Sequence, residues 1–174
     1  MKYAERIIKH PEFTALQKKI RRLEKERIYC HHELEHSLDV ARMAWIYFLE
    51  DCHRRGQIFP ERILEEKKDD IYTGALLHDI GRAGQYESGV HHSVVGQEIA
   101  RRILSDIGFP KERELKILNM ISEHHKDGAD LEQECFWADI YIKKADHDSR
   151  NCFLCEASDS CKWKVEERNK TIHC

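Results

Sequence analysis

Apolar residues recur along most of the chain at the spacing of an α-helix. One stripe follows Pro11 and consists of Phe13, Leu16, Ile20 and Leu23. Intervals of three and four residues place such side chains on a single helical face, and a proline suits the first turn of a helix. The chain has only three prolines, and alternation of β-branched with polar residues is nearly absent. The pattern predicts helices and not strands.

The hydrophobic pattern predicts further helices after this one, separated by short loops. They are expected at residues 29–51, 60–68, 69–79, 93–107, 111–125 and 136–148. Gly56 and Pro60 mark one loop, Gly108 and Pro110 mark another, and residues 84–89 are expected to form a polar loop. The fold class is therefore expected to be all-α.

The composition changes near residue 150, where cysteine, serine and aspartate become frequent. A chain of 174 residues is long enough for one domain with a real core. The expected division is an N-terminal helix packed on the core at 1–27, a helical core domain at 28–150, and a short Cys-containing C-terminal tail at 151–174.

Composition and charge limit the partners of the protein. Hydrophobic residues make up 41% of the chain and charged residues 35%, which is typical of a soluble, folded helical protein. The net charge of −3 gives no basic field to recruit polymeric nucleic acid or an anionic membrane. No apolar run approaches the ~20 residues that span a bilayer, and the N-terminus lacks the apolar region of a signal peptide. We expect a cytoplasmic protein, and the sequence leaves open whether it forms a homo-oligomer.

The chain is rich in clustered histidines and contains a histidine–aspartate pair at the end of an apolar run. His78 and Asp79 follow the segment 74–77, which is Gly-Ala-Leu-Leu. Adjacent side chains on a helix differ by ~100° in direction, so both reach one cavity only if the helix ends there. Gly81 is consistent with such an end. The alternative is a helix C-cap that carries an exposed acid.

Further metal-ligand side chains lie far from this pair in the sequence. His36 falls on an otherwise apolar helix face, and His32 lies four residues earlier on the same face. His32 is either a further ligand, a support for the ligands, or a solvated histidine. Asp146 follows Ala145 on a buried face, where a carboxylate needs a cation or several donors. Imidazole and carboxylate together suit a divalent transition metal, which favours a metal-dependent hydrolase.

The order His36, then His78-Asp79, then Asp146 resembles that of the HD-domain metal-dependent phosphohydrolase superfamily. The neighbouring helical segments are also similar to those of the family: Glu35-His-Ser-Leu-Asp-Val-Ala-Arg42, Ala75-Leu-Leu-His-Asp-Ile-Gly81 and Lys144-Ala-Asp146. The resemblance covers roughly residues 28–150. It implies an HD-type helical bundle that binds divalent metal ions, drawn from Fe, Mn, Co, Ni, Zn or Mg.

The resemblance extends to family members that hold two metal ions. These have two extra histidines between the His-Asp pair and the last Asp, and His92 and His124 match them best, with His91 and His125 as their neighbours. The resemblance thus implies one ion on His36, His78, Asp79 and Asp146, and a second on Asp79, His92 and His124. The alternative for the extra histidines is a surface position at helix ends.

The reaction implied by the resemblance is attack of a metal-activated hydroxide on the phosphorus of a small phosphorylated substrate, such as a nucleotide. Asp79 is expected to bridge the two ions, and Arg82 to contact a phosphate oxygen, unless Arg82 is an exposed loop cation. No organic cofactor is expected. Residues 124–128 are similar to the cyclic-dinucleotide phosphodiesterase branch, but no Gly-Tyr-Pro follows them, which disfavours that branch. A mixed-valent di-iron oxygenase on the same scaffold and a non-catalytic metal-binding regulator are the alternatives.

The C-terminal tail carries a second set of candidate metal ligands. Cys152 and Cys155 form a CxxC motif, Cys161 follows six residues later, and Cys174 lies at the terminus. Thiolates at this spacing hold zinc or an iron–sulfur cluster, and the alternative is a set of reduced free thiols. The other cysteines, which are Cys30, Cys52 and Cys135, lie in segments predicted as helices and are expected to be small core residues.

Overall fold

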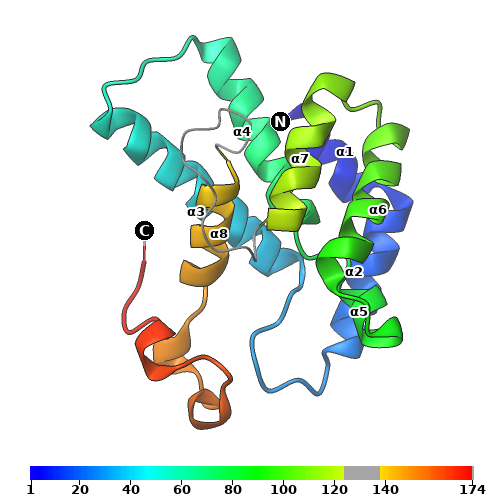
Figure 1. Ribbon diagram of the computed structural model, residues 1–174, viewed down its shortest axis with the longest axis vertical. Helices are drawn as coiled ribbons and strands as arrows, with labels where there is room; N and C mark the ends of the chain where they lie inside the picture. The colour runs from blue at the N-terminus through cyan, green and yellow to red at the C-terminus, as the bar shows by residue number, and fades with distance from the viewer. Residues whose placement is uncertain (124–137, 174) are drawn as a thin grey trace.

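The computed structural model describes residues 1–123 and 138–173, and all regular structure within those residues is helical (Figure 1). The helices are α1 (Lys2–Lys9), α2 (Pro11–Leu23), α3 (Leu34–Arg54), α4 (Glu61–Leu77), α5 (Arg82–Ser88), α6 (His92–Asp106), α7 (Lys111–Glu123) and α8 (Asp139–Asp148). The expected all-α fold class is confirmed.

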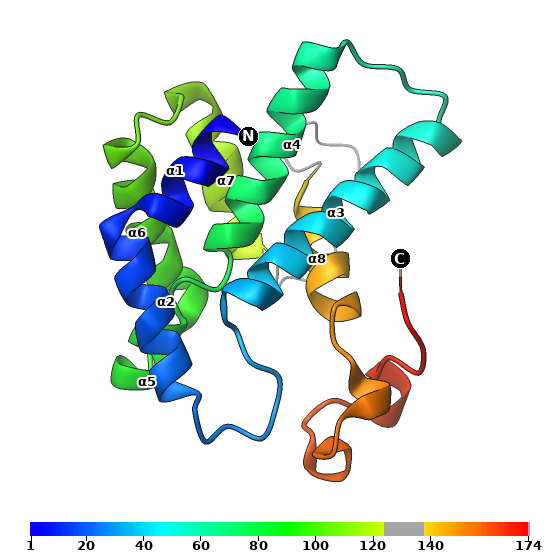
Figure 2. The ribbon, with the colours of Figure 1, turned by 180° about the vertical axis from the view of Figure 1, so that it is seen from behind.

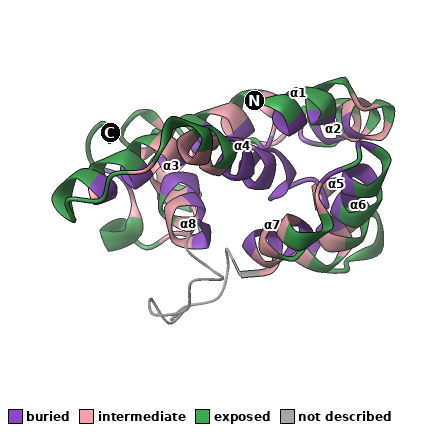
Figure 3. Ribbon diagram, turned by 90° about the horizontal axis from the view of Figure 1, so that it is seen from above, coloured by how far each residue is buried: buried purple, intermediate pink, exposed green. Residues whose placement is uncertain are grey.

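Helix α4 forms the centre of the molecule. It packs against α3, α1 and α7, while α8 packs on α3 and also contacts α4, and α6 packs on α7. Figure 3 shows the buried part of α4 between α3 and α8 on one side and α6 and α7 on the other. The second half of α4 is buried on nearly all sides, and its apolar residues Ile71, Ala75, Leu76 and Leu77 are fully buried. The chain segment that follows α4 therefore starts inside the protein.

Close helix packing around α4 depends on a small residue. A Cβ atom added at Gly74 would lie 2.5 Å from Met120 Sδ on α7 and 2.9 Å from Ile142 Cδ1 on α8. Since both distances are shorter than an ordinary carbon contact, glycine is what lets α7 and α8 approach α4 here.

The first helix is fixed to α4 by a capping carboxylate. Asp69 accepts hydrogen bonds from the backbone N–H groups of Tyr3, at 3.0 and 3.2 Å, and of Ala4, at 3.0 Å. These groups have no partner within α1 because they belong to its first turn. The buried carboxylate therefore satisfies the start of α1 and aligns it on the core.

Three of the expected element boundaries are wrong. The helix predicted at 29–51 begins only at Leu34, the helices predicted at 60–68 and 69–79 are one continuous helix, and the loop predicted at 84–89 belongs mostly to α5. No proline or glycine interrupts residues 61–73, so nothing ends α4 early. Helix α5 ends instead at Gly89, whose φ of +74° is a left-handed C-cap.

The C-terminal tail consists of short 3₁₀ turns at Cys152–Leu154, Ser158–Ser160 and Val165–Glu167. It lies beside the loop that joins α2 to α3, as the two opposite views show (Figures 1 and 2). The hydroxyl of Tyr29 in that loop donates to the carbonyl of Ser160 at 3.1 Å. Among the described residues, no helix combines the length and the apolar character that a bilayer crossing requires.

Candidate metal centre

Four side chains from three parts of the chain converge where α4 ends. His36 on α3, His78 and Asp79 after α4, and Asp146 on α8 each offer a donor atom, and these atoms all lie within 4.8 Å of one another. His78 Nε2 is 3.2 Å from Asp79 Oδ2, and His36 Nε2 is 3.2 Å from Asp146 Oδ1. Of the four, only His36 is not classed as buried. The structure thus brings together the residues that the sequence singled out first.

The end of α4 explains how two adjacent residues face one cavity. The regular helix stops at Leu77, His78 still has helical backbone angles, and Ile80 N–H donates back to Leu77 O at 3.2 Å. The chain therefore turns within Asp79 to Gly81 before α5 begins. The expectation that a helix ends at the His-Asp pair is confirmed.

Each imidazole in this region is held through Nδ1 and presents Nε2 to a carboxylate. His78 Nδ1 donates to Ala75 O at 2.6 Å, because a carbonyl oxygen only accepts. His36 Nδ1 lies 3.5 Å from Ser149 Oγ. A proton on Nδ1 leaves the Nε2 lone pair for a metal, which is how partners of ligand histidines orient them.

The same arrangement recurs at two further histidines around Asp79. His92 Nδ1 pairs with Gln85 Oε1 at 3.0 Å, and its Nε2 lies 3.4 Å from Asp79 Oδ1. His32 Nδ1 donates to a carboxylate, described below, and its Nε2 lies 4.0 Å from Asp79 Oδ2. Asp79 therefore has imidazole nitrogens near both of its oxygens, as a carboxylate shared between two positions would.

The other predicted histidines are placed differently. His91 is exposed and caps α6, where its Nδ1 pairs with the Ser93 hydroxyl at 2.8 Å and accepts from the Ser93 backbone N–H. His124 and His125 lie outside the described residues. Of the histidines expected between Asp79 and Asp146, His92 is thus the one that the structure brings to Asp79.

The electrostatics of the centre favour a cation. Burial alone would raise the pKa of Asp79, but His78 and Arg82 hold it well below its usual range. Burial likewise opposes ionisation of Asp146, yet hydrogen bonds from His36 and His78 keep its pKa low. Burial lowers the pKa of His78, while the two carboxylates raise it to about 10. A metal ion bound at His78 Nε2 would compete with a proton for that nitrogen.

Sequence reasoning missed a buried carboxylate that positions His32. Glu24 is only 1% exposed and accepts from the His32 backbone N–H at 2.7 Å, from His32 Nδ1 at 2.6 Å, and from the Tyr86 hydroxyl. Burial raises its pKa, but the contacts with His32 and Tyr86 lower it to about 2. His32 lies before α3 and not on its face, so the predicted helical register of His32 with His36 is wrong.

Two arginines bracket the carboxylates. Arg82, the first residue of α5, donates from Nε to Asp79 Oδ1 at 2.8 Å, so it is not the exposed loop cation of the alternative interpretation. Arg150, which the sequence did not single out, donates to Asp146 Oδ1 and Oδ2 at 3.0 and 2.9 Å. Its spacing of four residues from Asp146 was the available signal.

A cavity of about 620 Å³, here called the basic cavity, opens beside the centre. Its lining includes His32 and four cations, which are Arg27, Arg82, Arg150 and Lys162. Glu167 is the acidic residue on its wall. The cavity therefore presents a largely positive surface next to Asp79.

The cysteines divide into two groups. Cys52 is buried in α3, as expected of a small core residue. Cys30 is not in a helix, which corrects the prediction, and it lines a cavity together with Cys152, Cys155 and Cys161. Cys135 and Cys174 lie outside the described residues.

An all-helical bundle that gathers a His, His-Asp, Asp set at its centre defines a class of metal-binding domain. The HD domain family matches residues 34–157, which is most of the chain. The chain belongs to that family, and the resemblance inferred from the sequence is confirmed. HD domains bind divalent metals, and the cluster at His36, His78, Asp79 and Asp146 has the donor atoms to hold one.

Similar proteins agree with this assignment. An uncharacterized protein of Clostridium beijerinckii is 35% identical over 167 residues, which is 96% of both chains. Ribonuclease Y of Thermosipho melanesiensis is 34% identical over 116 residues, and that of Chloroflexus aurantiacus is 31% identical over 127 residues. These regions cover 67% and 73% of this chain but only 18% and 20% of the ribonucleases.

One solved structure shares the fold. It is a predicted HD superfamily hydrolase from an uncultured Thermotogales bacterium, with a TM-score of 0.57 and 18% sequence identity. The match covers 90% of this chain and 79% of the other. The shared fold agrees with the assignment to the HD domain family.

Proposed function

We propose that this protein is a metal-dependent phosphohydrolase that acts on a nucleotide or another small phosphate ester. The observation that carries the proposal is the common orientation of four imidazoles. His32, His36, His78 and His92 are each held through Nδ1 and turn Nε2 toward Asp79 or Asp146. Buried imidazoles arranged around two ionised carboxylates are suited to metal binding and not to apolar packing.

The residues divide between two metal positions in this proposal. His36, His78, Asp79 and Asp146 hold the first ion, and Asp79 and His92 contribute to the second with His124. His32, whose Nε2 faces Asp79 Oδ2 at 4.0 Å, is a further candidate ligand. Asp79 is near imidazoles on both oxygens, which supports a bridging role. When bound, such ions lower the pKa of coordinated water and stabilise charge on phosphoryl oxygens.

The chain's own cations bind and orient the phosphate group. Arg82 lines the basic cavity and contacts Asp79, so a phosphate placed there lies between the guanidinium and the metal centre. Arg27 and Lys162 extend the positive surface away from the centre. The cavity volume of about 620 Å³ is within the range of sites for nucleotide-sized ligands.

Substitution of Asp79 tests the proposal. Asp79→Ala should strip the metal from the His/Asp centre and lower turnover by roughly 10³-fold or more, because it removes a ligand of both positions. The matched control is Asp106→Ala, which removes an exposed carboxylate at the end of α6. Metal per chain is measured by mass spectrometry, helical content by circular dichroism, and phosphate release with Mn²⁺ or Co²⁺ on nucleotides and generic mono- and diesters. An Asp79→Ala protein that keeps both metal and turnover would refute the role of Asp79.

The same assays separate the alternative functions. Iron-dependent consumption of O₂ without phosphate release would favour the oxygenase. Stoichiometric metal with no turnover on any ester would favour a regulatory protein. The similarity to part of ribonuclease Y makes a short RNA oligonucleotide a necessary member of the substrate panel. The net charge of −3, with cations gathered in one cavity, supports a small substrate over a polymer.

A further inference from the structure

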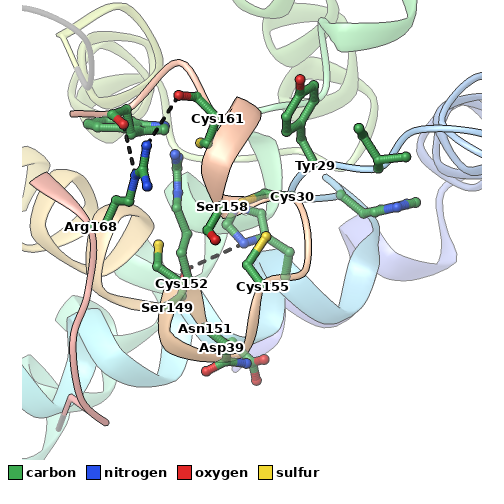
Figure 4. A pocket seen from close by; sticks show the side chains of 15 residues that line it. Tyr29, Cys30, Asp39, Ser149, Asn151, Cys152, Cys155, Ser158, Cys161 and Arg168 are labelled. Atoms are coloured by element: carbon green, nitrogen blue, oxygen red, sulfur yellow. Dashed lines mark hydrogen bonds between the residues drawn. The ribbon is translucent and has the colours of Figure 1, made fainter. Parts of the chain in front are cut away.

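Four cysteines from two distant segments meet on the wall of one cavity. This cavity of about 390 Å³, here called the thiol pocket, is lined by Cys30 from the loop before α3 and by Cys152, Cys155 and Cys161 from the tail. Figure 4 shows these four side chains around the pocket. All four are free thiols and half-buried. Cys30 is thus the fourth thiol of the cluster, and the fold brings it to the tail although it lies more than a hundred residues earlier in the sequence.

The local backbone holds three of the thiols in tight turns. Cys155 N–H donates to Cys152 O at 3.2 Å, and Cys161 N–H donates to Ser158 O at 3.1 Å. A CxxC turn of this kind presents two sulfurs on the same side, which is the usual half of a structural zinc site. Burial raises the pKa of Cys30, and the nearby Cys152 and Cys155 raise it further while Arg150 opposes them.

The tail lacks a hydrophobic core of its own. None of its 3₁₀ turns contains a buried residue, and Leu154, Val165 and Ile172 are 76%, 59% and 80% exposed. Among residues 151–173 only Asn169 is buried. Small segments that cannot bury enough apolar surface usually depend on a metal or on cross-links. The hydrogen bonds of the tail alone are a weak basis for its compact shape.

We propose that Cys30, Cys152, Cys155 and Cys161 form a structural zinc site in the thiol pocket, whose wall also includes His36 of the His/Asp centre. Four thiolates are the ligand set that zinc prefers in closed tetrahedral sites, with sulfur about 2.3 Å from the ion. Among the described residues, only the His/Asp centre already brings its donor atoms within 4.8 Å of one another. The ion would therefore draw the sulfurs together by rotation of short side chains, with release of the thiol protons.

This zinc site would connect two segments that carry residues of the metal centre. Cys30 precedes His32 by two residues, and Cys152 follows Arg150 by two. Arg150 holds both oxygens of Asp146, and it also lies 4.9 Å from the ring centroid of Trp163 in the tail. Fixing the tail would thereby fix the guanidinium that positions Asp146.

Metal analysis in the Asp79→Ala background tests the site without catalysis. Asp79→Ala should retain one zinc per chain, and Asp79→Ala/Cys30→Ser should lose it. The control Asp79→Ala/Cys52→Ser should retain the zinc, because Cys52 lies in the core away from the thiol pocket. Cys152→Ser serves as a second variant, with circular dichroism to check folding. Zinc that persists in both thiol-pocket variants would overturn the proposal.

Cobalt substitution identifies the ligands directly. Co²⁺ in this site should give a near-ultraviolet sulfur-to-metal charge-transfer band, which histidine and carboxylate ligands cannot give. The band should weaken in Cys30→Ser, which removes one of four thiolates, and keep its full intensity in Cys174→Ser. The reverse result would assign the fourth ligand to Cys174 and overturn the role of Cys30. Iron and acid-labile sulfide in the purified protein would indicate an iron–sulfur cluster and overturn the zinc proposal. Because the band does not depend on turnover, failure of the phosphohydrolase proposal would leave this test intact.

Discussion

Substitution of Gly81 by alanine tests how the metal centre is assembled from neighbouring helices. Gly81 precedes α5 and has φ of −78° and ψ of −4°, angles that any L-residue adopts. At such a position, alanine ordinarily stabilises a protein by about 0.4–1 kcal/mol, because it restricts the unfolded chain. On backbone conformation alone, Gly81→Ala should therefore raise the free energy of unfolding.

Packing predicts the opposite sign. A Cβ atom at Gly81 would lie 2.0 Å from His92 O and 2.5 Å from Gly96 N, and both are backbone atoms of α6. Ordinary contact begins near 3.4 Å, so the two segments would have to separate by roughly 1.4 Å (3.4 − 2.0). Overpacking that moves backbone costs about 3 kcal/mol. After the gain in the unfolded chain, Gly81→Ala should lose about 2–3 kcal/mol.

The same displacement would reach the metal centre through His92. Its Nε2 lies 3.4 Å from Asp79 Oδ1, and a shift of its backbone carries the imidazole away from that oxygen. Urea denaturation followed by circular dichroism gives the change in stability, and metal per chain reports occupancy of the proposed second position. The control is Gly89→Ala, where φ is +74° and a Cβ meets nothing within 4 Å, so the cost is about 1 kcal/mol of left-handed strain. A Gly81→Ala protein as stable as the wild type would refute the packing argument.

Two further substitutions test contacts that join separate segments. Tyr141→Phe removes the hydroxyl of α8 that donates to Asp51 Oδ2 on α3 at 2.7 Å, and should lower the free energy of unfolding by about 1–2 kcal/mol. The hydrogen bond from Tyr141 holds the pKa of Asp51 below its ordinary value. The difference in stability between the wild type and Tyr141→Phe should therefore be present at neutral pH and disappear as the pH falls through the pKa of Asp51 in the folded protein. Urea denaturation at several pH values measures this difference, and a difference that persists in acid would contradict the prediction. Glu24→Gln replaces one acceptor oxygen by an amide that cannot accept from His32, and should weaken metal binding by about 10-fold or more. Metal titration of the two proteins measures this, and equal affinities would show that Glu24 does not orient His32.

The parts of the fold that depend on local periodicity could be predicted from the sequence. The apolar stripe after Pro11 gave α2 its observed bounds, Pro11–Leu23. The continuity of α4 was missed because its second half is buried on all sides. Because Ile71, Ala75, Leu76 and Leu77 are all inaccessible, this half of α4 shows no alternation of an apolar with a polar face. The hydrophobic pattern therefore does not reveal that residues 69–77 continue the helix that begins at Glu61.

The candidate site divides in the same way. His36, the His-Asp pair and Asp146 could be found because their order and spacing form a pattern along the chain. Glu24 could not, because it lies in a run of charged residues, Glu-Lys-Glu-Arg, that is indistinguishable from a solvated surface. Its burial arises only when the loop before α3 folds back and places His32 beside it. The same loop carries Cys30, so the sequence alone did not indicate that Cys30 lies near the cysteines of the tail.

The charge balance of the centre gives a physical reason for an anionic substrate. Asp79 and Asp146 are ionised, and Arg82 and Arg150 lie on them, so these four groups sum to zero. The two carboxylates are already neutralised by the two guanidinium groups. A divalent metal ion bound between the carboxylates would therefore give the buried centre a net positive charge. Such an excess is costly unless an anion compensates it. A phosphate group entering from the basic cavity supplies that charge, whereas a neutral substrate does not. For the proposed phosphohydrolase, the two arginines would therefore favour an anionic phosphate ester over a neutral substrate.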